Sequence, residues 1–173
     1  MGLVQKGEKV FLDTSGLVAL FLKSDTNHAE VKYIWNQLRK SGCRLFTSEY
    51  VLDELLTLLL TKSSHHFACE VGQGLLNTSL MSLIYIQDEQ VSAIFNKFNK
   101  YDDKQFSFTD VSSFYLMELE GIDKAVAFDE HFSQAGFTLL SLQDNADLHD
   151  YYRRRNKKTI SLDQIFADRK KKH

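Results

Sequence analysis

The stretch that decides the fold is Val10-Phe11-Leu12-Asp13-Thr14-Ser15-Gly16. An apolar run typical of a short strand ends on an aspartate, and the residues that follow lead into the apolar segment 17–22. A second strand-like run, Ala125-Val126-Ala127-Phe128, also ends on an acid, Asp129. Acids in such places are costly unless they are paired or bound to a cation. The repeated pattern therefore predicts strand ends that carry a functional site.

Strand-like and helix-like segments alternate along the chain. Helical spacing of apolar residues predicts helices, among them residues 49–62 and 109–120. Such alternation implies right-handed crossovers between neighbouring strands. We therefore predict an α/β protein of three layers, α/β/α, with a mainly parallel central sheet of about five strands. Short β-branched and aromatic runs place these strands at residues 9–12, 44–47, 83–86, 124–128 and 137–140.

Composition fits a globular protein with one main domain. Hydrophobic residues make up 43% of the 173 residues and charged residues 25%, which is ordinary for such proteins. Cys43 and Cys69 form neither a disulfide framework nor a zinc-ligand spacing. No apolar run approaches the roughly 18 residues of a membrane span, and no signal peptide is expected. We expect a cytoplasmic protein without membrane contact, with a domain over residues 1–145.

The remaining residues, 146–173, form a basic C-terminal extension. Residues 151–173 hold nine Lys or Arg against two acids, a balance of +7, whereas the rest of the chain holds twelve against twenty-one, a balance of -9. A short helix is expected at residues 162–166. The aromatics Tyr151 and Tyr152 stand beside cations, which suits stacking on bases and contact with phosphates, although a solvated tail is the alternative. The candidate RNA-binding residues are Arg153, Arg154, Arg155, Lys157 and Lys158.

Four acids are the candidate metal ligands: Asp13, Glu54, Asp110 and Asp129. Ligands of a parallel α/β sheet bind outside the carboxyl ends of its strands, where Asp13 and Asp129 are predicted to lie. Two carboxylates about 4 Å apart repel by roughly 4 kcal/mol at an effective dielectric near 20, so a cluster requires a cation. Mg²⁺ and Mn²⁺ prefer such oxygen ligands. Singly, each acid also has a structural reading, as a helix cap, a partner of a helix dipole or a half-exposed side chain.

The chain resembles PIN-domain nucleases, particularly the VapC-type toxins of bacterial toxin–antitoxin pairs. The resemblance extends from residue 9 to about residue 140, with the four acids in the family's order. It rests on four matching stretches: Phe11-Leu12-Asp13-Thr14-Ser15 with Leu17-Val18-Ala19-Leu20-Phe21, Ser48-Glu49-Tyr50-Val51-Leu52-Asp53-Glu54-Leu55, Phe106-Ser107-Phe108-Thr109-Asp110, and Ala127-Phe128-Asp129-Glu130-His131-Phe132.

The resemblance implies a Mg²⁺- or Mn²⁺-dependent endoribonuclease that hydrolyses phosphodiester bonds of single-stranded or structured RNA, as the toxin of a type II toxin–antitoxin pair. It makes Asp13, Glu54 and Asp110 metal ligands, with Asp129 completing the site directly or through water. Thr14 or Ser15 would orient Asp13. A small cognate antitoxin and a homodimer are the protein partners that it implies. The choice of Glu54 over its neighbour Asp53 follows the family's register.

Two other functions fit parts of the pattern. A PIN-like fold without cleavage would act as an RNA- or protein-binding module, although such a module has no need for clustered carboxylates. Aspartyl-phosphate chemistry would use Asp13 as a nucleophile. The phosphatases of that kind carry a second aspartate two residues further on, where this chain has Ser15.

Overall fold

The computed structural model describes residues 3–141 and 161–166. Its centre is a five-stranded sheet of order β3-β2-β1-β4-β5, in which every neighbouring pair is parallel. The predicted α/β architecture with five strands is therefore confirmed. The strands are β1 (Lys9–Leu12), β2 (Arg44–Ser48), β3 (Met81–Ile84), β4 (Lys124–Val126) and β5 (Thr138–Leu139).

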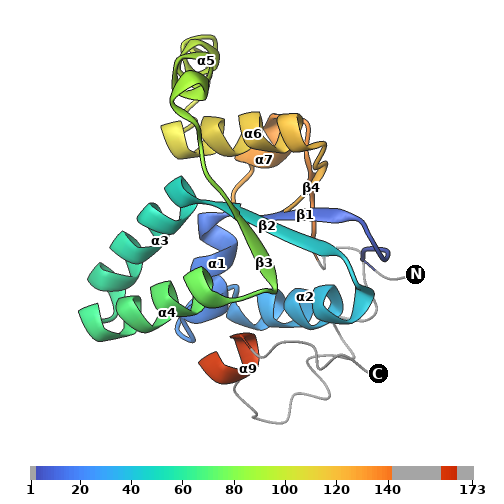
Figure 1. Cartoon of the computed structure of the whole chain (residues 1–173), viewed down its shortest axis with the longest axis vertical. Helices are drawn as coiled ribbons and strands as arrows, with labels where there is room; N and C mark the ends of the chain where they lie inside the picture. Colours follow the sequence, from blue (N-terminus) through green and yellow to red (C-terminus); the bar gives the residue numbers. More distant parts are fainter. Residues whose placement is uncertain (1–2, 142–160, 167–173) are drawn as a thin grey trace.

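Helices cover both faces of the sheet. Figure 1 shows α1, α2 and α4 on one side of the sheet and α6 and α7 on the other. The strand order runs outward from β1 to β3 and then returns to β4, so the chain changes face between β3 and β4. The helices are α1 (Thr14–Phe21), α2 (His28–Ser41), α3 (Glu49–Lys62), α4 (His65–Asn77), α5 (Asp88–Phe98), α6 (Phe108–Glu120), α7 (His131–Gln134) and α9 (Leu162–Phe166).

Local sequence explains where several helices begin and end. The Ser48 hydroxyl accepts a hydrogen bond from the Val51 amide and caps α3, which spans the predicted residues 49–62. Gly42 follows α2 in the left-handed conformation that glycine adopts without a steric penalty. Both helices thus have clear sequence signals at the end that joins them to β2.

Two strands differ from their predicted positions by two residues, whereas β2 is one residue longer than predicted and β5 is one residue shorter at each end. The third strand was expected at residues 83–86, but it pairs with β2 from Met81 opposite Leu45 to Ile84 opposite Ser48, where β2 gives way to α3. The fourth strand was expected to run to residue 128 but ends at Val126, because its partner β1 ends opposite it at Leu12. In both cases the neighbouring strand, rather than the strand's own composition, sets the length.

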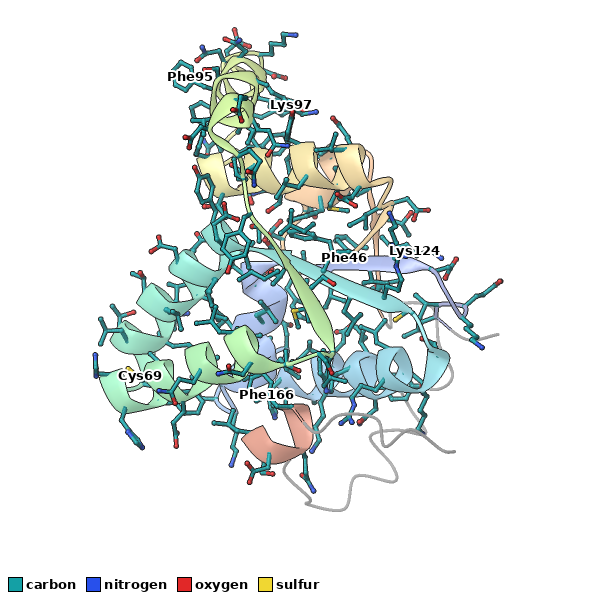
Figure 2. All side chains as sticks on the ribbon, in the orientation of Figure 1. Phe46, Cys69, Phe95, Lys97, Lys124 and Phe166 are labelled. Atoms are coloured by element: carbon teal, nitrogen blue, oxygen red, sulfur yellow. The ribbon has the colours of Figure 1, made fainter. Side chains whose placement is uncertain are left out.

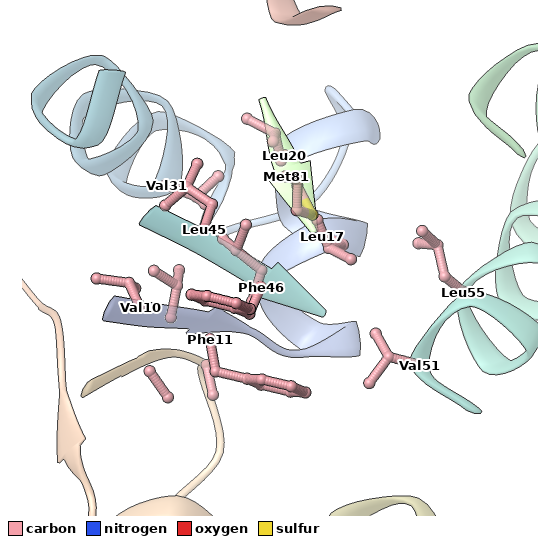
Figure 3. Close-up of a cluster of buried hydrophobic side chains, with 14 of the residues drawn as sticks. Val10, Phe11, Leu17, Leu20, Val31, Leu45, Phe46, Val51, Leu55 and Met81 are labelled. Carbon is pink, nitrogen blue, oxygen red and sulfur yellow. The ribbon is translucent and has the colours of Figure 1, made fainter. Parts of the chain in front are cut away.

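The core lies on both faces of the sheet. Figure 3 shows side chains of β1 and β2 packed among those of α1, α2 and α3. Val10 and Phe11 are adjacent on β1 and point to opposite faces, yet both are fully buried. Strands covered on both faces read as continuous apolar runs, which accounts for the stretch before Asp13.

The C-terminal helix α9 packs against the body of the domain. Figure 2 shows Phe166 on the side of α9 that faces α4. Its ring stacks on Phe21 with centroids 5.7 Å apart, and Ile165 is buried. Residues 162–166 thus form the predicted helix. The candidate RNA-binding residues 153–158 lie outside the described part of the chain. Within the described part, no helix is long and apolar enough to cross a membrane.

Candidate active site

The site lies where β1 and β4 are neighbours and the strand order reverses. At such a switch point the connections leave the sheet towards opposite faces and open a crevice at the strand ends. The backbone there is fixed by two hydrogen bonds. The Thr47 hydroxyl donates to the Leu12 carbonyl at 2.9 Å, and the Asp13 amide donates to the Val126 carbonyl at 3.2 Å.

A cleft of about 470 Å³ opens at this edge of the sheet. All four candidate ligands line it, and the neighbouring Asp53 does not. Asp53 is exposed, whereas Glu54 is half-buried one residue further along α3. The cleft is lined by Asp13, Thr14, Ser15, Val18, Asp25, Asn27, Glu54, Leu58, Lys62, Ser107, Asp110, Phe128, Asp129 and His131.

Asp13 is the most buried of the four acids, with 3% of its surface exposed. It caps α1, and its Oδ2 accepts hydrogen bonds from the Ser15 amide at 3.0 Å and the Ser15 hydroxyl at 2.7 Å. Burial raises the pKa of Asp13 to about 7. The bonds from Ser15 oppose this shift in pKa, and the charge of Asp129 adds to it. A buried acid of this kind gains from a nearby cation.

The Ser15 hydroxyl joins the ends of β1 and β4. Its Oγ accepts a hydrogen bond from the Phe128 amide at 3.0 Å and lies 3.4 Å from Asp129 Oδ2. Asp129 in turn accepts a bond from the His131 amide at 3.0 Å. Ser15 is therefore placed to orient Asp13, as one of the two predicted alternatives, and it also contacts Asp129.

Thr14 contacts a different acid. Its hydroxyl donates to Glu54 Oε2 at 2.6 Å. This bond connects the first turn of α1 with α3, and both residues line the cleft. Thr14 is thus placed to orient Glu54 rather than Asp13.

Asp110 is held by the start of its own helix and by a histidine. The Ser107 amide donates to Asp110 Oδ2 at 2.7 Å, and the Ser107 hydroxyl accepts from the Asp110 amide at 3.0 Å, which completes a capping box. His131 Nδ1 lies 3.1 Å from the same Oδ2. The His131 ring packs edge-on against Phe106. These contacts fix the direction in which Asp110 faces the cleft.

Gly16 allows α1 to approach β4 closely. A Cβ at this position would lie 2.4 Å from the Val126 carbonyl oxygen, closer than real Cβ contacts come. The opposing atom belongs to the backbone and cannot rotate away. Gly16 therefore lets the start of α1, which follows Asp13 directly, lie close to the end of β4.

The donor chemistry of the cleft fits Mg²⁺ or Mn²⁺. It offers carboxylate oxygens from four acids, which are the ligands that these ions prefer. Each of the four carboxylates accepts a hydrogen bond: Asp13 from Ser15, Glu54 from Thr14, Asp110 from Ser107, and Asp129 from the His131 amide. In the described part of the chain, no three Asp, Glu, His or Cys side chains stand close enough together to hold an ion.

The cleft also contains polar residues that are not among the predicted site residues: Asp25, Asn27, Lys62, Ser107 and His131. Spacing could have identified two of them. Lys62 follows Glu54 by eight residues on the same predicted helix, and His131 follows Asp129 by two. Asn27 comes from the connection between α1 and α2, for which the sequence carries no comparable signal.

Comparison with known proteins gives concordant results. The family model of the PIN domain matches residues 10–138. The 23S rRNA-specific endonuclease VapC20 of Mycobacterium tuberculosis is 31% identical over 128 residues, which cover 74% of this chain and 95% of that protein. A VapC ribonuclease of Archaeoglobus fulgidus is 27% identical over 124 residues, 70% of this chain and 78% of that protein.

The fold agrees with a solved structure. The crystal structure of Mycobacterium tuberculosis VapC20, described as a Sarcin-Ricin loop cleaving toxin, matches with a TM-score of 0.70 and 29% identity. The match covers 75% of this chain and 96% of that chain. The chain therefore belongs to the PIN-domain family. The prediction of a VapC-type endoribonuclease, of the kind found as toxins in toxin–antitoxin pairs, is confirmed.

Proposed function

We propose that this endoribonuclease cuts RNA at the cleft described above, with Mg²⁺ or Mn²⁺ held by Asp13, Glu54, Asp110 and Asp129. The observation that carries the proposal is that acids from four separate segments line one cleft at the β1–β4 switch point. Structural caps alone would not require four acids to face a common space. Burial raises the pKa of Asp13 and the charge of Asp129 adds to that rise, so a bound cation would stabilise the ionised acids.

When bound, a divalent ion supplies an activated water and stabilises charge on the phosphoryl group. The chain's own residues prepare the site for it. Ser15 holds Asp13, Thr14 holds Glu54, and Ser107 together with His131 holds Asp110. Such supporting hydrogen bonds fix the direction of a ligand's oxygens and commonly affect metal affinity or activity about 10–100-fold.

The proposed substrate is structured RNA, with ribosomal RNA as the first candidate. The support is that a relative with 31% identity over 95% of its own length is specific for 23S rRNA. A cytoplasmic location follows from this substrate. We also propose that a small cognate antitoxin silences the enzyme, and that the enzyme forms a homodimer. The basic extension of residues 146–173 would assist RNA binding.

Cleavage assays test this function. Purified protein is incubated with ribosomal RNA and with single-stranded RNA in Mg²⁺, in Mn²⁺ and in EDTA. Cleavage in either metal, its loss in EDTA, and its loss in the Asp13→Asn and Asp110→Asn variants are the expected results. Equal cleavage by the wild type and both variants would refute the proposed site. Binding of RNA without any cleavage would favour the non-cleaving module.

A further inference from the structure

The charge of the cleft is unbalanced for a site that receives a polyanion. Five of its lining residues are acids: Asp13, Asp25, Glu54, Asp110 and Asp129. Among the lining residues, Lys62 is the sole lysine or arginine. An RNA strand brings a phosphate at every nucleotide, and a metal at the four proposed ligands would neutralise only the reacting one. Beside so many acids, a flanking phosphate would be stabilised by a cationic side chain.

Lys62 is on the correct face of α3 to supply that cation. Glu54, Leu58 and Lys62 follow one another at intervals of four residues, and all three line the cleft. At about 1.5 Å per residue, the Lys62 backbone lies about 12 Å along the helix from that of Glu54. Helical side chains lean towards the amino terminus of their helix, so the Lys62 side chain extends back along this face.

The Lys62 ammonium is available for a ligand. The side chain is exposed, and within the described part of the chain no hydrogen bond or ion pair involves it. Other lysines differ in this respect: Lys97 pairs with Glu118, and Lys124 pairs with Glu8. Lys62 therefore does not have to break a contact within the described domain to bind a phosphate.

We propose that Lys62 binds a phosphate of the RNA strand next to the one that is cleaved. This inference rests on the proposed function for its site and adds a substrate-binding residue to it. The contact is electrostatic and independent of base identity, because a lysine ammonium recognises the phosphate as a point charge. It sets the position of the strand relative to the acids, rather than the chemical step.

Lys40 provides a matched control for a purely structural role of Lys62. Lys62 stands in the last turn of its helix, where a cation also stabilises the helix dipole. Lys40 occupies the same kind of position in α2, is also exposed, and does not line the cleft. The variants Lys62→Ala and Lys40→Ala thus remove the same charge from the same kind of helix end. Of the two variants, only Lys62→Ala removes a cation from the cleft.

Kinetics and salt dependence provide the test, with full-length protein and an RNA that it cleaves. Lys62→Ala should raise KM about three- to tenfold with little change in kcat, and Lys62→Arg should restore the wild-type value. Binding of poly(U) is measured in the Asp13→Asn background, and the logarithm of the binding constant is plotted against the logarithm of the salt concentration. Lys62→Ala should reduce the magnitude of this slope by about 0.7, the value for one phosphate contact to a single strand. Lys40→Ala should change neither quantity.

Identical KM and salt slope for Lys62→Ala and Lys40→Ala would overturn the inference while leaving the proposed function intact. A lower kcat at unchanged KM would also overturn it. If no RNA is cleaved, the proposed function fails. The poly(U) slope then still decides whether Lys62 contacts a phosphate. Thermal unfolding of both alanine variants shows whether the protein remains folded, and Lys62→Gln replaces Lys62→Ala if it does not.

Discussion

The Thr14 hydroxyl donates a hydrogen bond to the Glu54 carboxylate at 2.6 Å, and this bond joins α1 to α3 at the cleft. Thr14 directly follows Asp13, and Glu54 lies on α3. One contact therefore relates the positions of two proposed metal ligands that are 41 residues apart in sequence.

Removal of this hydroxyl should weaken the site without removing a ligand. Thr14→Val keeps the shape of the side chain but cannot donate to Glu54, so we expect Mn²⁺ affinity and RNA cleavage to fall about 10–100-fold. Thr14→Ser retains the hydroxyl and should remain near the wild type. Calorimetric titration with Mn²⁺ and cleavage rates measure both effects. Equal losses in the serine and valine variants would show that packing, rather than the hydrogen bond, is responsible.

The raised pKa of Asp13 predicts a pH dependence of stability in metal-free protein. Its pKa is 3.8 in a solvated reference state and about 7 in the folded protein, because the carboxyl is buried. Between these values the folded state holds a proton that the unfolded state has released. The contribution of Asp13 to the free energy of unfolding should therefore fall as pH rises from about 4 to 7 and then level off.

Asp13→Asn removes this titration and supplies the control. Urea denaturation in EDTA at several pH values gives the difference in unfolding free energy between wild type and variant. We expect the wild type to lose stability relative to the variant across this pH window. Mn²⁺ affinity of the wild type should rise over the same window, since the ion displaces the proton. A constant difference from pH 4 to 8 would contradict the burial of an uncompensated Asp13.

Gly16 should resist substitution more strongly than a second helical glycine. Alanine at residue 16 would meet the Val126 carbonyl, whereas alanine at Gly72 would meet the Leu56 side chain at 3.2 Å, which can adjust. Alanine favours a helix over glycine by about 1 kcal/mol, so Gly72→Ala should be near neutral. Gly16→Ala should lower both unfolding free energy and activity. Similar stability of the two variants would contradict the close approach of α1 to β4.

The docking of α9 predicts a coupling between two residues far apart in sequence. A Cβ at Gly74 would lie 2.2 Å from the Phe166 ring, so Gly74→Ala should expel the ring from α4 and destabilise the protein. In a Phe166→Ala background the same change should be neutral or stabilising by up to about 1 kcal/mol, because only the helix preference remains. A double-mutant cycle by urea denaturation measures this coupling. Additive effects would show that α9 is not held there.

The sequence predicts the architecture well because its signals are local. An apolar run before Asp13 and a serine before α3 each describe their own segment, and the structure contains both elements. Strand ends are less predictable, since β3 and β4 stop where their neighbours stop. Nothing in the sequence of residues 124–128 indicates that the pairing of β4 with β1 ends at Val126.

The composition of the cleft is only partly readable from the sequence. The order of the four acids along the chain, taken with parallel strands, predicts that they share an edge of the sheet, and all four line the cleft. Their partners depend on three-dimensional contacts between distant segments. The contact of Thr14 with Glu54 and the approach of His131 to Asp110 follow from how α1, α3, α6 and α7 pack.

Mn²⁺ titration of paired variants shows whether the acids of the cleft act together as one divalent-metal site. Glu54→Gln removes a proposed ligand, and Asp53→Asn removes the exposed acid beside it on the same helix. We predict that Glu54→Gln weakens Mn²⁺ binding at least about tenfold, whereas Asp53→Asn leaves it unchanged. Equal Mn²⁺ affinity in both variants, or a loss confined to Asp53→Asn, would contradict the account.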